Sequence, residues 1–358
     1  MPSHPRSRLL RWGIPVLALL LVTAAVVVGV RWWRDAHRSA LQQAVAMAPD
    51  DAQQLSWTHW SAVRDELGLD LGDDDDPGAD EVQELLDRGF EADLTQTTAL
   101  GGSATQMQRA LGFSPATADW ELFSQSDKGA VVMVRLPDSV DMEQVTATVA
   151  ASGYAEPDDE GGVWVGELAL LAELGGITPE LAYLVVDEDR HLVLSSDNRG
   201  YLADAAEDMR DENGPDGLDG VVEAAGDPLA AAIYTGDHAC AKLAMSQADD
   251  GDQQQAAELL AQAGQVNPMT GFALALRPGG DVRVAMEFES DDQARTNADT
   301  RATLASGPAP GEGGEYADLF QLGAVEADGT VVTMELDPVA NGYTFSALKD
   351  GPVLFATC

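Results

Sequence analysis

The sequence predicts an α+β protein: an N-terminal transmembrane helix followed by two sandwich-like α/β domains, each an antiparallel sheet with helices on one face. Three observations lead to this prediction. One uncharged segment near the N-terminus is long enough to cross a bilayer. The candidate strands come in hairpins rather than in strict alternation with helices. A strand, an acidic cap, a helix and a closing glycine recur about 153 residues apart, which indicates a structural duplication.

The uncharged segment covers residues 13–30 (GIPVLALLLVTAAVVVGV), which as a helix would span about 27 Å. Tryptophans, which favour the headgroup region of a bilayer, flank it at both ends: Trp12, Trp32 and Trp33. The alternative is a cleaved signal peptide, but VRWWRD follows the apolar core where a small-x-small cleavage site is expected. We therefore expect a tail over 1–12, an uncleaved anchor over 13–33, and the lipid bilayer as a partner of that helix.

The orientation of the anchor rests on weaker signals, because three arginines lie on each side of it. The short N-terminal tail and the two cysteines favour a cytoplasmic N-terminus, with the bulk of the chain outside. The predicted location is therefore the cell membrane, with a single pass and an extracytoplasmic main part.

The chain is strongly acidic, with 20 Lys+Arg against 61 Asp+Glu and a formal net charge of -41. A surface of carboxylates repels a phosphate backbone, which excludes nucleic acid as a natural partner. Hydrophobic residues make up 45% of the chain, which is typical of a globular protein rather than a disordered one. Because self-repulsion opposes compaction, we expect added salt or Ca²⁺ to raise the melting temperature.

The first predicted domain covers 52–210 and follows a juxtamembrane helix over 34–51. Its acidic loop, 70–80, contains four adjacent aspartates and a Pro-Gly pair, which disfavour regular structure. Thr58 is the expected cap of one of its helices. The expected strands cover 55–58, 119–125, 130–137, 162–167, 181–187 and 190–196, and the expected helices cover 36–48, 59–67, 81–89, 105–111, 140–151 and 199–210.

The second predicted domain covers 218–358 and begins after a linker over 211–217 (DENGPDG), where Gly, Pro, Asn and Asp occur together. The proposed duplication rests on residues 130–153 and 282–307, which share the order strand, acidic cap, helix and glycine. The expected strands cover 229–235, 271–277, 282–289, 320–327 and 330–337, and the expected helices cover 237–248, 253–263 and 291–305.

The two cysteines, Cys240 and Cys358, are expected to form a disulfide, since cysteines outside the cytoplasm usually pair. The closed loop of about 119 residues would stabilise the fold by roughly 4 to 5 kcal/mol and would fasten a C-terminal strand over 352–358. The alternative is a reactive thiol assisted by His238. Residues two apart in a helix point about 200° away from each other, so that pair would not meet.

The run from Asp73 to Glu84 partly matches a calcium-binding EF-hand loop. Asp73 and Asp75 take its first and third positions, a glycine takes the sixth and Glu84 the twelfth. Pro77 at the fifth position offers no side-chain oxygen, and Asp80 occupies an apolar position. Two interpretations stay open: a specific Ca²⁺ site at Asp73, Asp75 and Glu84, and a solvated loop that binds divalent cations weakly.

The familiar motifs of enzyme active sites are absent from the sequence, which has no G-x-S-x-G, H-E-x-x-H, P-loop or G-x-G-x-x-G. We therefore expect no enzyme, no catalytic residues and no cofactor. The leading hypothesis is a non-enzymatic interaction or structural module of the cell envelope, with an envelope protein as its partner. The alternatives are a carrier for an apolar or amphiphilic ligand and a wall hydrolase that uses paired carboxylates.

Three segments carry a resemblance to known sequences: 55–68 (LSWTHWSAVRDELG), 113–122 (FSPATADWEL) and 351–358 (GPVLFATC). Together they resemble a group of uncharacterised single-pass envelope proteins of high-GC Gram-positive bacteria. The scarcity of lysine beside abundant Ala, Gly and Asp suits a high-GC coding sequence. The resemblance implies an envelope location, and it brings no activity and no functional residues with it.

Overall fold

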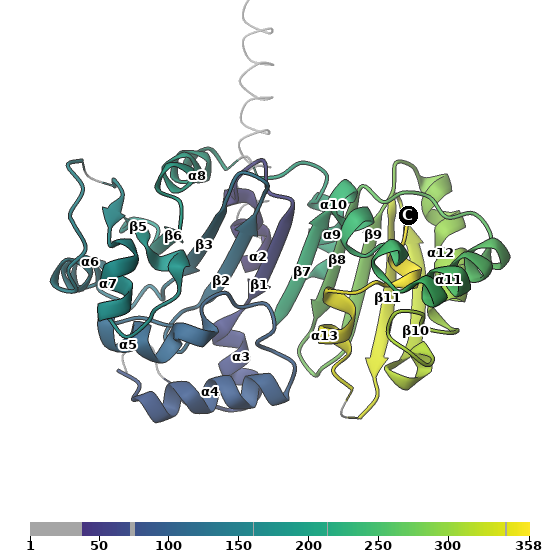
Figure 1. Cartoon of the computed structure of the whole chain (residues 1–358), viewed down its shortest axis with the longest axis horizontal. Coiled ribbons are helices and arrows are strands. Elements are labelled where there is room, and N and C mark those ends of the chain that lie inside the picture. The colour runs from purple at the N-terminus through teal and green to yellow at the C-terminus, as the bar shows by residue number, and fades with distance from the viewer. Residues whose placement is uncertain (1–37, 72–75, 160, 213, 341) are drawn as a thin grey trace, which may run out of the picture.

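The described part of the chain is built on one antiparallel sheet of eleven strands, which runs across the whole molecule (Figure 1). The structure is a computed structural model that describes residues 38–71, 76–159, 161–212, 214–340 and 342–358. The strand order is β10-β11-β9-β8-β7-β1-β2-β3-β6-β5-β4. The strands are β1 (Gln54–Thr58), β2 (Trp120–Gln125), β3 (Ala130–Arg135), β4 (Trp164–Val165), β5 (Tyr183–Asp187), β6 (Leu192–Ser196), β7 (Ala230–Thr235), β8 (Gly271–Leu276), β9 (Val282–Glu287), β10 (Phe320–Asp328) and β11 (Val331–Pro338).

The two predicted sheets are in fact one, because β1 pairs with β7 as well as with β2. Ser56 of β1 lies opposite Phe123 on one side and Ala232 on the other. Leu55 and Trp57 of the same strand are fully buried in the core on one face of the sheet, and Ser56 and Thr58 are buried on the other face. A strand paired on both sides and buried on its faces belongs in the middle of a sheet. The two halves of the molecule therefore share one continuous core on each face.

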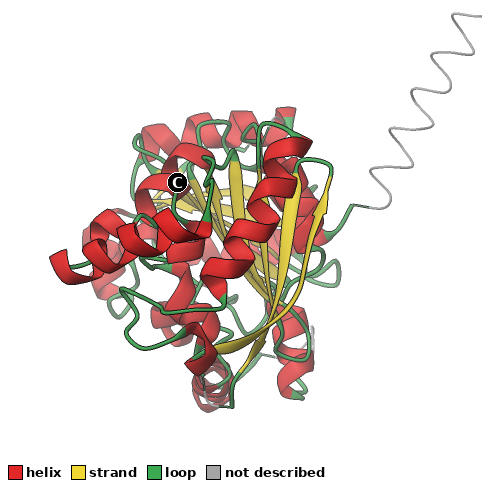
Figure 2. Cartoon of the chain, turned by 90° about the vertical axis from the view of Figure 1, so that its right-hand side faces the viewer, coloured by secondary structure: helices red, strands yellow, loops and turns green. Residues whose placement is uncertain are grey.

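Helices cover both faces of the sheet, whereas the sequence predicted helices on one face (Figure 2). The central strands carry apolar side chains on both faces, so each face needs a cover. One face packs against α2 (Ala40–Met47), α8 (Arg199–Asp211) and α9 (Asp219–Ala225). The other packs against α3 (Trp60–Leu67), α4 (Ala79–Glu91), α5 (Ala104–Leu111), α6 (Met142–Ala151), α7 (Glu167–Glu173), α10 (Gly236–Lys242), α11 (Asp250–Ala263), α12 (Asp291–Ala305) and α13 (Thr344–Lys349).

The strand order repeats on the two sides of the β1–β7 junction. Outward from the junction, one half reads β1-β2-β3-β6-β5 and the other reads β7-β8-β9-β11-β10. In each half a central strand is followed by a hairpin, a long helix (α6 or α12) and a second hairpin. The first half adds the short edge strand β4 outside β5, and within the described residues the second half has no strand outside β10.

Helix ends follow signals that are readable in the sequence. Asn198 caps α8 by accepting hydrogen bonds from two backbone N–H groups, and Ser290 caps α12 by accepting one, from the Gln293 N–H. Gly68 ends α3 in the left-handed conformation, with φ of 62°. Thr58 is not the cap of α3, because its hydroxyl instead lies 2.8 Å from that of Thr97.

Several short elements differ from the prediction. β4 has two residues rather than six, and α7, α9 and α13 were not expected. The predicted C-terminal strand is instead a 3-10 turn over Leu354–Ala356. The carbonyl groups of Phe355 and Thr357 accept hydrogen bonds from the guanidinium of Arg301, so this segment is held by a side chain rather than by a neighbouring strand.

The predicted tail, the anchor over 13–33 and its flanking tryptophans Trp12, Trp32 and Trp33 lie outside the described residues. Within the described part of the chain, no helix is both long enough and apolar enough to cross a bilayer. The described part of the predicted juxtamembrane helix is α2. It begins with a capping box in which Ser39 and Gln42 satisfy each other's backbone N–H groups, and it ends before Pro49.

The disulfide between Cys240 and Cys358 is confirmed, and it links residues 118 apart in the sequence. It fastens the C-terminus to α10, which packs on β7 and β8 in the second half of the chain. No free thiol remains, since the chain has two cysteines. The disulfide thereby excludes the reactive thiol that the sequence left open, and His238 stacks on Tyr234, with 5.8 Å between the ring centroids.

The two halves also contact each other away from the sheet, through a buried carboxylate. Asp93, in the loop after α4, accepts hydrogen bonds from the backbone N–H of Ser346, at 3.1 Å, and from its hydroxyl. Ser346 lies on α13 of the other half. Burial raises the pKa of Asp93, although the hydrogen bonds from Ser346 oppose that shift.

Lowering the pH from 7.5 to 5 is expected to raise the melting temperature, because the carboxyls with a raised pKa outnumber the two histidines whose pKa burial lowers and which act in the opposite direction. Burial raises the pKa of Asp93, Glu287 and Glu312, and for Asp208 the neighbouring aspartates add to that effect. A carboxyl with a raised folded-state pKa binds its proton more tightly when folded. Its stabilising contribution is complete below the unfolded pKa of about 4 and is lost as the pH rises through the folded value. A melting temperature that falls throughout this range would contradict the assignment, and Asp93→Asn should flatten the profile.

Candidate functional site

Part of the outer edge of β5 is open. β4 pairs with Tyr183 and Leu184 of β5 and no further. Before Trp164 the chain turns away from the sheet, and the Gly162 N–H donates to the carbonyl of Asp159 at 3.0 Å. Among the described residues, no strand pairs with the outer edge of residues 185–187.

A groove of about 540 Å³ lies beside this open stretch, and we call it the edge groove. It lies at the β4–β5 end of the sheet, in the other half of the chain from the disulfide. One wall is the loop that precedes β4, another is the turn between β5 and β6, and α6 and α8 contribute from the two faces of the sheet. The groove is lined by Thr146, Glu156, Pro157, Asp158, Asp159, Gly161, Trp164, Val185, Val186, Asp187, Glu188, Asp189, Arg190 and Arg210.

The edge groove is strongly acidic, because six carboxylates and two arginines line it. One arginine is already paired: Arg190 Nη1 lies 3.0 Å from Asp187 Oδ2. Glu188 is positioned by Thr146, whose hydroxyl donates to its carboxylate at 2.7 Å. The excess of negative charge attracts cationic groups, and the partly enclosed surface strengthens that attraction relative to open water.

The backbone of β5 presents hydrogen-bonding groups to the edge groove. In an antiparallel strand, the N–H and C=O of alternate residues point to the same side. The carbonyl of Ala182 faces β4, since it accepts a hydrogen bond from the Gly166 N–H at 2.9 Å. Leu184, opposite Trp164, faces the same way. The N–H and C=O of Val186 therefore point outward, into the stretch that β4 leaves open.

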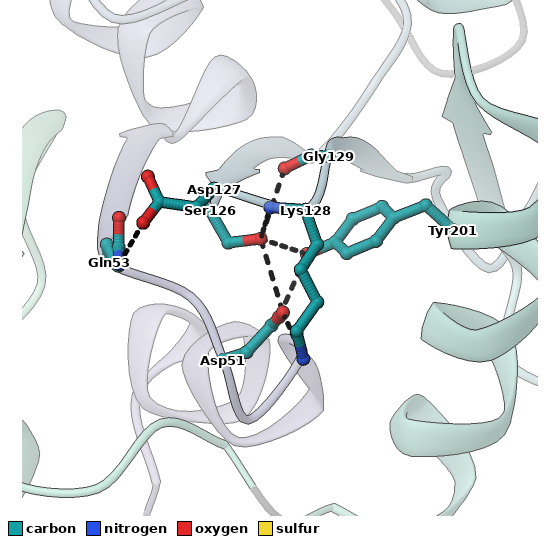
Figure 3. Close-up of polar contacts among 7 residues, drawn as sticks. All are labelled: Asp51, Gln53, Ser126, Asp127, Lys128, Gly129 and Tyr201. Carbon is teal, nitrogen blue, oxygen red and sulfur yellow. Dashed lines mark hydrogen bonds and ion pairs between the residues drawn. The ribbon is translucent and has the colours of Figure 1, made fainter.

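A second polar arrangement lies at the turn between β2 and β3, and Figure 3 shows its side chains converging on Asp51. We call Asp51, Ser126, Lys128 and Tyr201 the turn cluster. The Tyr201 hydroxyl donates to Asp51 at 3.1 Å, and the Lys128 ammonium lies 3.1 Å from the same carboxylate. The Ser126 hydroxyl lies 3.3 Å from Asp51 and 3.3 Å from the Tyr201 hydroxyl. A serine, a lysine and a tyrosine within reach of one another invite comparison with nucleophilic active sites.

The protonation states of the turn cluster favour a structural role over a catalytic one. The hydrogen bond to Asp51 and the charge of Asp51 raise the pKa of Lys128, so its ammonium keeps its proton and is no base for Ser126. Burial raises the pKa of Tyr201 to about 12, so its hydroxyl also stays protonated. The cluster instead connects three segments, namely the α2–β1 loop, the β2–β3 turn and α8.

Replacing Tyr201 with phenylalanine is expected to lower the free energy of unfolding by about 1 to 2 kcal/mol. The substitution removes a hydroxyl that bonds to a charged acceptor and leaves the buried ring in place. Urea unfolding measures the loss. Tyr183→Phe is the matched control, because among the described residues its hydroxyl forms no hydrogen bond. Equal losses in the two variants would contradict the assigned role.

The structure does not bring the predicted calcium ligands together within the part it describes. Asp73 and Asp75 lie outside the described residues, and the carboxylate of Glu84 lies 3.3 Å from Arg88 on the same helix. Across the described residues, no group of three or more His, Cys, Asp or Glu side chains is arranged to hold a metal ion. Glu84 is therefore engaged in an ion pair on α4.

Sequence reasoning missed the edge groove. The run 162–167 has the composition of a full strand, and a strand was predicted over all six residues. The signal that opposed this prediction was the stretch before it, where Pro157, three acids and two glycines precede Trp164. That composition is typical of a turn, and here it delays the start of β4 to Trp164.

Comparisons with known proteins leave the chain without an assigned family. No family model matches it, and no curated protein matches it. Two crystal forms of a protein named TP0453 are similar to it among solved structures. Form I has a TM-score of 0.39 and 7% identity, over 84% of this chain and 95% of that one. Form III has a TM-score of 0.39 and 8% identity, over 85% of this chain and 97% of that one. We draw no conclusion about function from a likeness at this level.

Proposed function

We propose that the chain is a single-pass protein of the cell membrane, and that its folded extracytoplasmic part is a non-enzymatic interaction module of the cell envelope. The observation that carries this proposal is the open stretch of β5 in the edge groove. An open sheet edge is where a second chain can pair, and folded proteins generally cover or blunt their edges. An edge left open between charged walls is therefore suited to binding a partner.

Several features support the proposed location. The uncharged segment 13–30 is long enough to cross a bilayer, and tryptophans flank it at both ends. Disulfides such as Cys240–Cys358 persist in oxidising compartments outside the cytoplasm. The resemblance to envelope proteins of high-GC Gram-positive bacteria agrees with both. The N-terminus would then be cytoplasmic, with residues 34–358 outside.

We also propose that the folded part of the chain consists of two copies of one structural unit. The two units are 52–210 and 218–358, joined by the linker 211–217. The repeated strand order on the two sides of the β1–β7 junction supports this, and so does the helix that precedes each central strand, α2 before β1 and α9 before β7. The outer edge of β5 then corresponds to the outer edge of β10, but β5 alone has a partial cover, β4, and a groove beside it.

The two alternative functions receive less support from the geometry. A carrier for an apolar ligand needs a cavity lined mainly by hydrophobic side chains, whereas charged side chains dominate the edge groove. A hydrolase of this type needs one carboxyl whose pKa is raised so that it acts as an acid. The carboxyls of Asp93 and Glu287, whose pKa burial raises, lie outside the edge groove.

Site-specific cross-linking in intact cells tests the proposal. A photoreactive phenylalanine analogue replaces Asp158 in the groove wall or, as the control, the exposed Glu258 on α11 at the other end of the sheet. We expect a discrete adduct from position 158 and none from position 258. Equal labelling at both positions, or no adduct at position 158, would overturn the binding role.

Protease added to intact spheroplasts tests the proposed location. We expect cleavage of the folded part of the chain under these conditions. Complete protection of residues 39–358 would overturn an extracytoplasmic location.

A further inference from the structure

We propose that the edge groove binds an extended, Lys/Arg-rich segment of a partner protein, which adds as a strand to the open edge of β5. This inference rests on the proposed function and names the chemistry of its partner. Two independent features of the groove carry it. The first is the outward-facing backbone of Val186, and the second is the excess of carboxylates around it.

The backbone determines the conformation of the ligand. The open stretch covers residues 185–187, which at about 3.3 Å per residue is roughly 10 Å of edge. An incoming strand would take the place that β4 vacates and would exchange two hydrogen bonds with the N–H and C=O of Val186. Helices from both faces flank the edge, through Thr146 on α6 and Arg210 on α8. A helical ligand cannot supply the two backbone hydrogen bonds, whereas an extended one can.

The charge determines the side chains of the ligand. In a strand, successive side chains point to opposite faces, so both walls of the groove contact the ligand. Asp158 and Asp159 stand on the loop wall, and Glu188 and Asp189 on the turn wall, and all four are exposed. Basic side chains on both faces of the added strand would therefore meet carboxylates. The two backbone hydrogen bonds to Val186 alone would give weak binding, so the ion pairs have to supply much of the affinity.

A second copy of this chain is a poorer occupant. The formal net charge is -41, so two copies repel each other. The long edge strand β10 is also a poor donor for strand addition. Its pairing register shifts between Leu322 and Val325, and its exposed end carries Glu326 and Asp328, which would face the acidic walls.

Peptide binding to the full chain in detergent micelles tests the inference. The probe is a fluorescently labelled peptide of the sequence Lys-Lys-Val-Lys-Lys-Val-Lys, which carries lysines on both faces when extended, and its binding is measured by anisotropy in 20 mM and 200 mM NaCl. Saturable binding that weakens with salt is expected. A peptide with glutamate in place of lysine should not bind.

A third peptide tests the backbone hydrogen bonds. It is a lysine peptide whose alternate backbone amides are N-methylated, so it keeps its charge and loses the N–H groups that would donate to the edge of β5. We expect about fivefold weaker binding for it, because the ligand loses the donor of one of the two hydrogen bonds, the one to the Val186 carbonyl.

Matched variants locate the site. The double variant Asp158→Lys/Asp159→Lys is expected to weaken binding at least about tenfold in 20 mM NaCl. Glu258→Lys/Asp299→Lys makes the same change of net charge on exposed positions of α11 and α12, and should change binding less than about threefold. Equal weakening by the two double variants would mean that the whole acidic surface attracts the peptide, and would overturn the groove as the site.

The remaining outcomes separate this inference from the proposed function. Unchanged affinity of the N-methylated peptide would overturn strand addition, and binding of the glutamate peptide would overturn the basic partner. An adduct at position 158 in cells, together with no saturable binding of the lysine peptide, would leave the interaction module standing and refute its basic ligand. Peptide binding with no adduct in cells would support the ligand chemistry and refute the cellular role.

Discussion

Replacing Cys240 and Cys358 together with alanine is expected to lower the free energy of unfolding by about 3 to 5 kcal/mol. The disulfide joins residues 118 apart, and closing a loop of that length restricts the unfolded chain by about 5 kcal/mol in the chain-entropy model. The lower end of the range reflects contacts that remain. Phe355 stays fully buried, and the Leu354 N–H still donates to the hydroxyl of Tyr316 at 2.9 Å.

Urea unfolding of the full chain measures this loss. The variant should also show a steeper dependence of stability on urea, because its unfolded state exposes more surface than the cross-linked one. Chemical reduction of the unaltered chain serves as the control, since it opens the same loop without changing any side chain volume. An unchanged unfolding midpoint in either experiment would mean that the bond contributes nothing to stability.

Local patterns in the sequence were sufficient to predict the hairpins and the long helices. Strands β8 and β9 lie within one or two residues of their predicted bounds, and α12 covers the predicted 291–305. Such elements carry their own information, because alternation, caps and turn residues all lie within a few positions of one another. The cysteine pairing was predictable for a similar reason, since a chain with two cysteines has one pairing.

The pairing of β1 with β7 had no local signal. Ser56 and Ala232 become neighbours through the packing of two whole halves, and no pattern near either residue states that choice. The edge groove also had no local signal of its own. It exists because β4 begins only at Trp164, opposite Leu184, and a strand-like composition over 162–167 hid that late start. The acidic loop wall was visible as composition, but its position beside an open strand edge required the sheet topology.

Replacing Arg301 with methionine is expected to lower the free energy of unfolding by about 3 to 5 kcal/mol. Arg301 is fully buried on α12, and its guanidinium donates to the carbonyl groups of Phe355, Thr357 and Asn267, at 2.6, 2.9 and 2.8 Å. Burial lowers the pKa of Arg301 to about 9, so the group is still charged at neutral pH. Methionine fills much of the same volume and leaves three buried carbonyl groups without their donor, which is costly.

Arg295→Met provides the matched control for that experiment. Arg295 lies on the same helix, is exposed, and pairs with Asp292 one turn earlier. Removal of an exposed ion pair should change the free energy of unfolding by less than about 0.5 kcal/mol. A similar small effect for Arg301→Met would mean that the buried guanidinium does not hold the C-terminal segment.

Arg301 and the disulfide hold the same segment, so their contributions should not add. With the disulfide intact, the C-terminal segment cannot leave α12. The three carbonyl groups that lose their donor in Arg301→Met then stay buried without a hydrogen bond. In the Cys240→Ala/Cys358→Ala background the segment is free to move, so the carbonyl groups of Phe355 and Thr357 reach water. Arg301→Met should therefore cost about 1 to 2 kcal/mol less in that background than in the oxidised chain. Costs that add across the four proteins would show that the two contacts stabilise the fold independently.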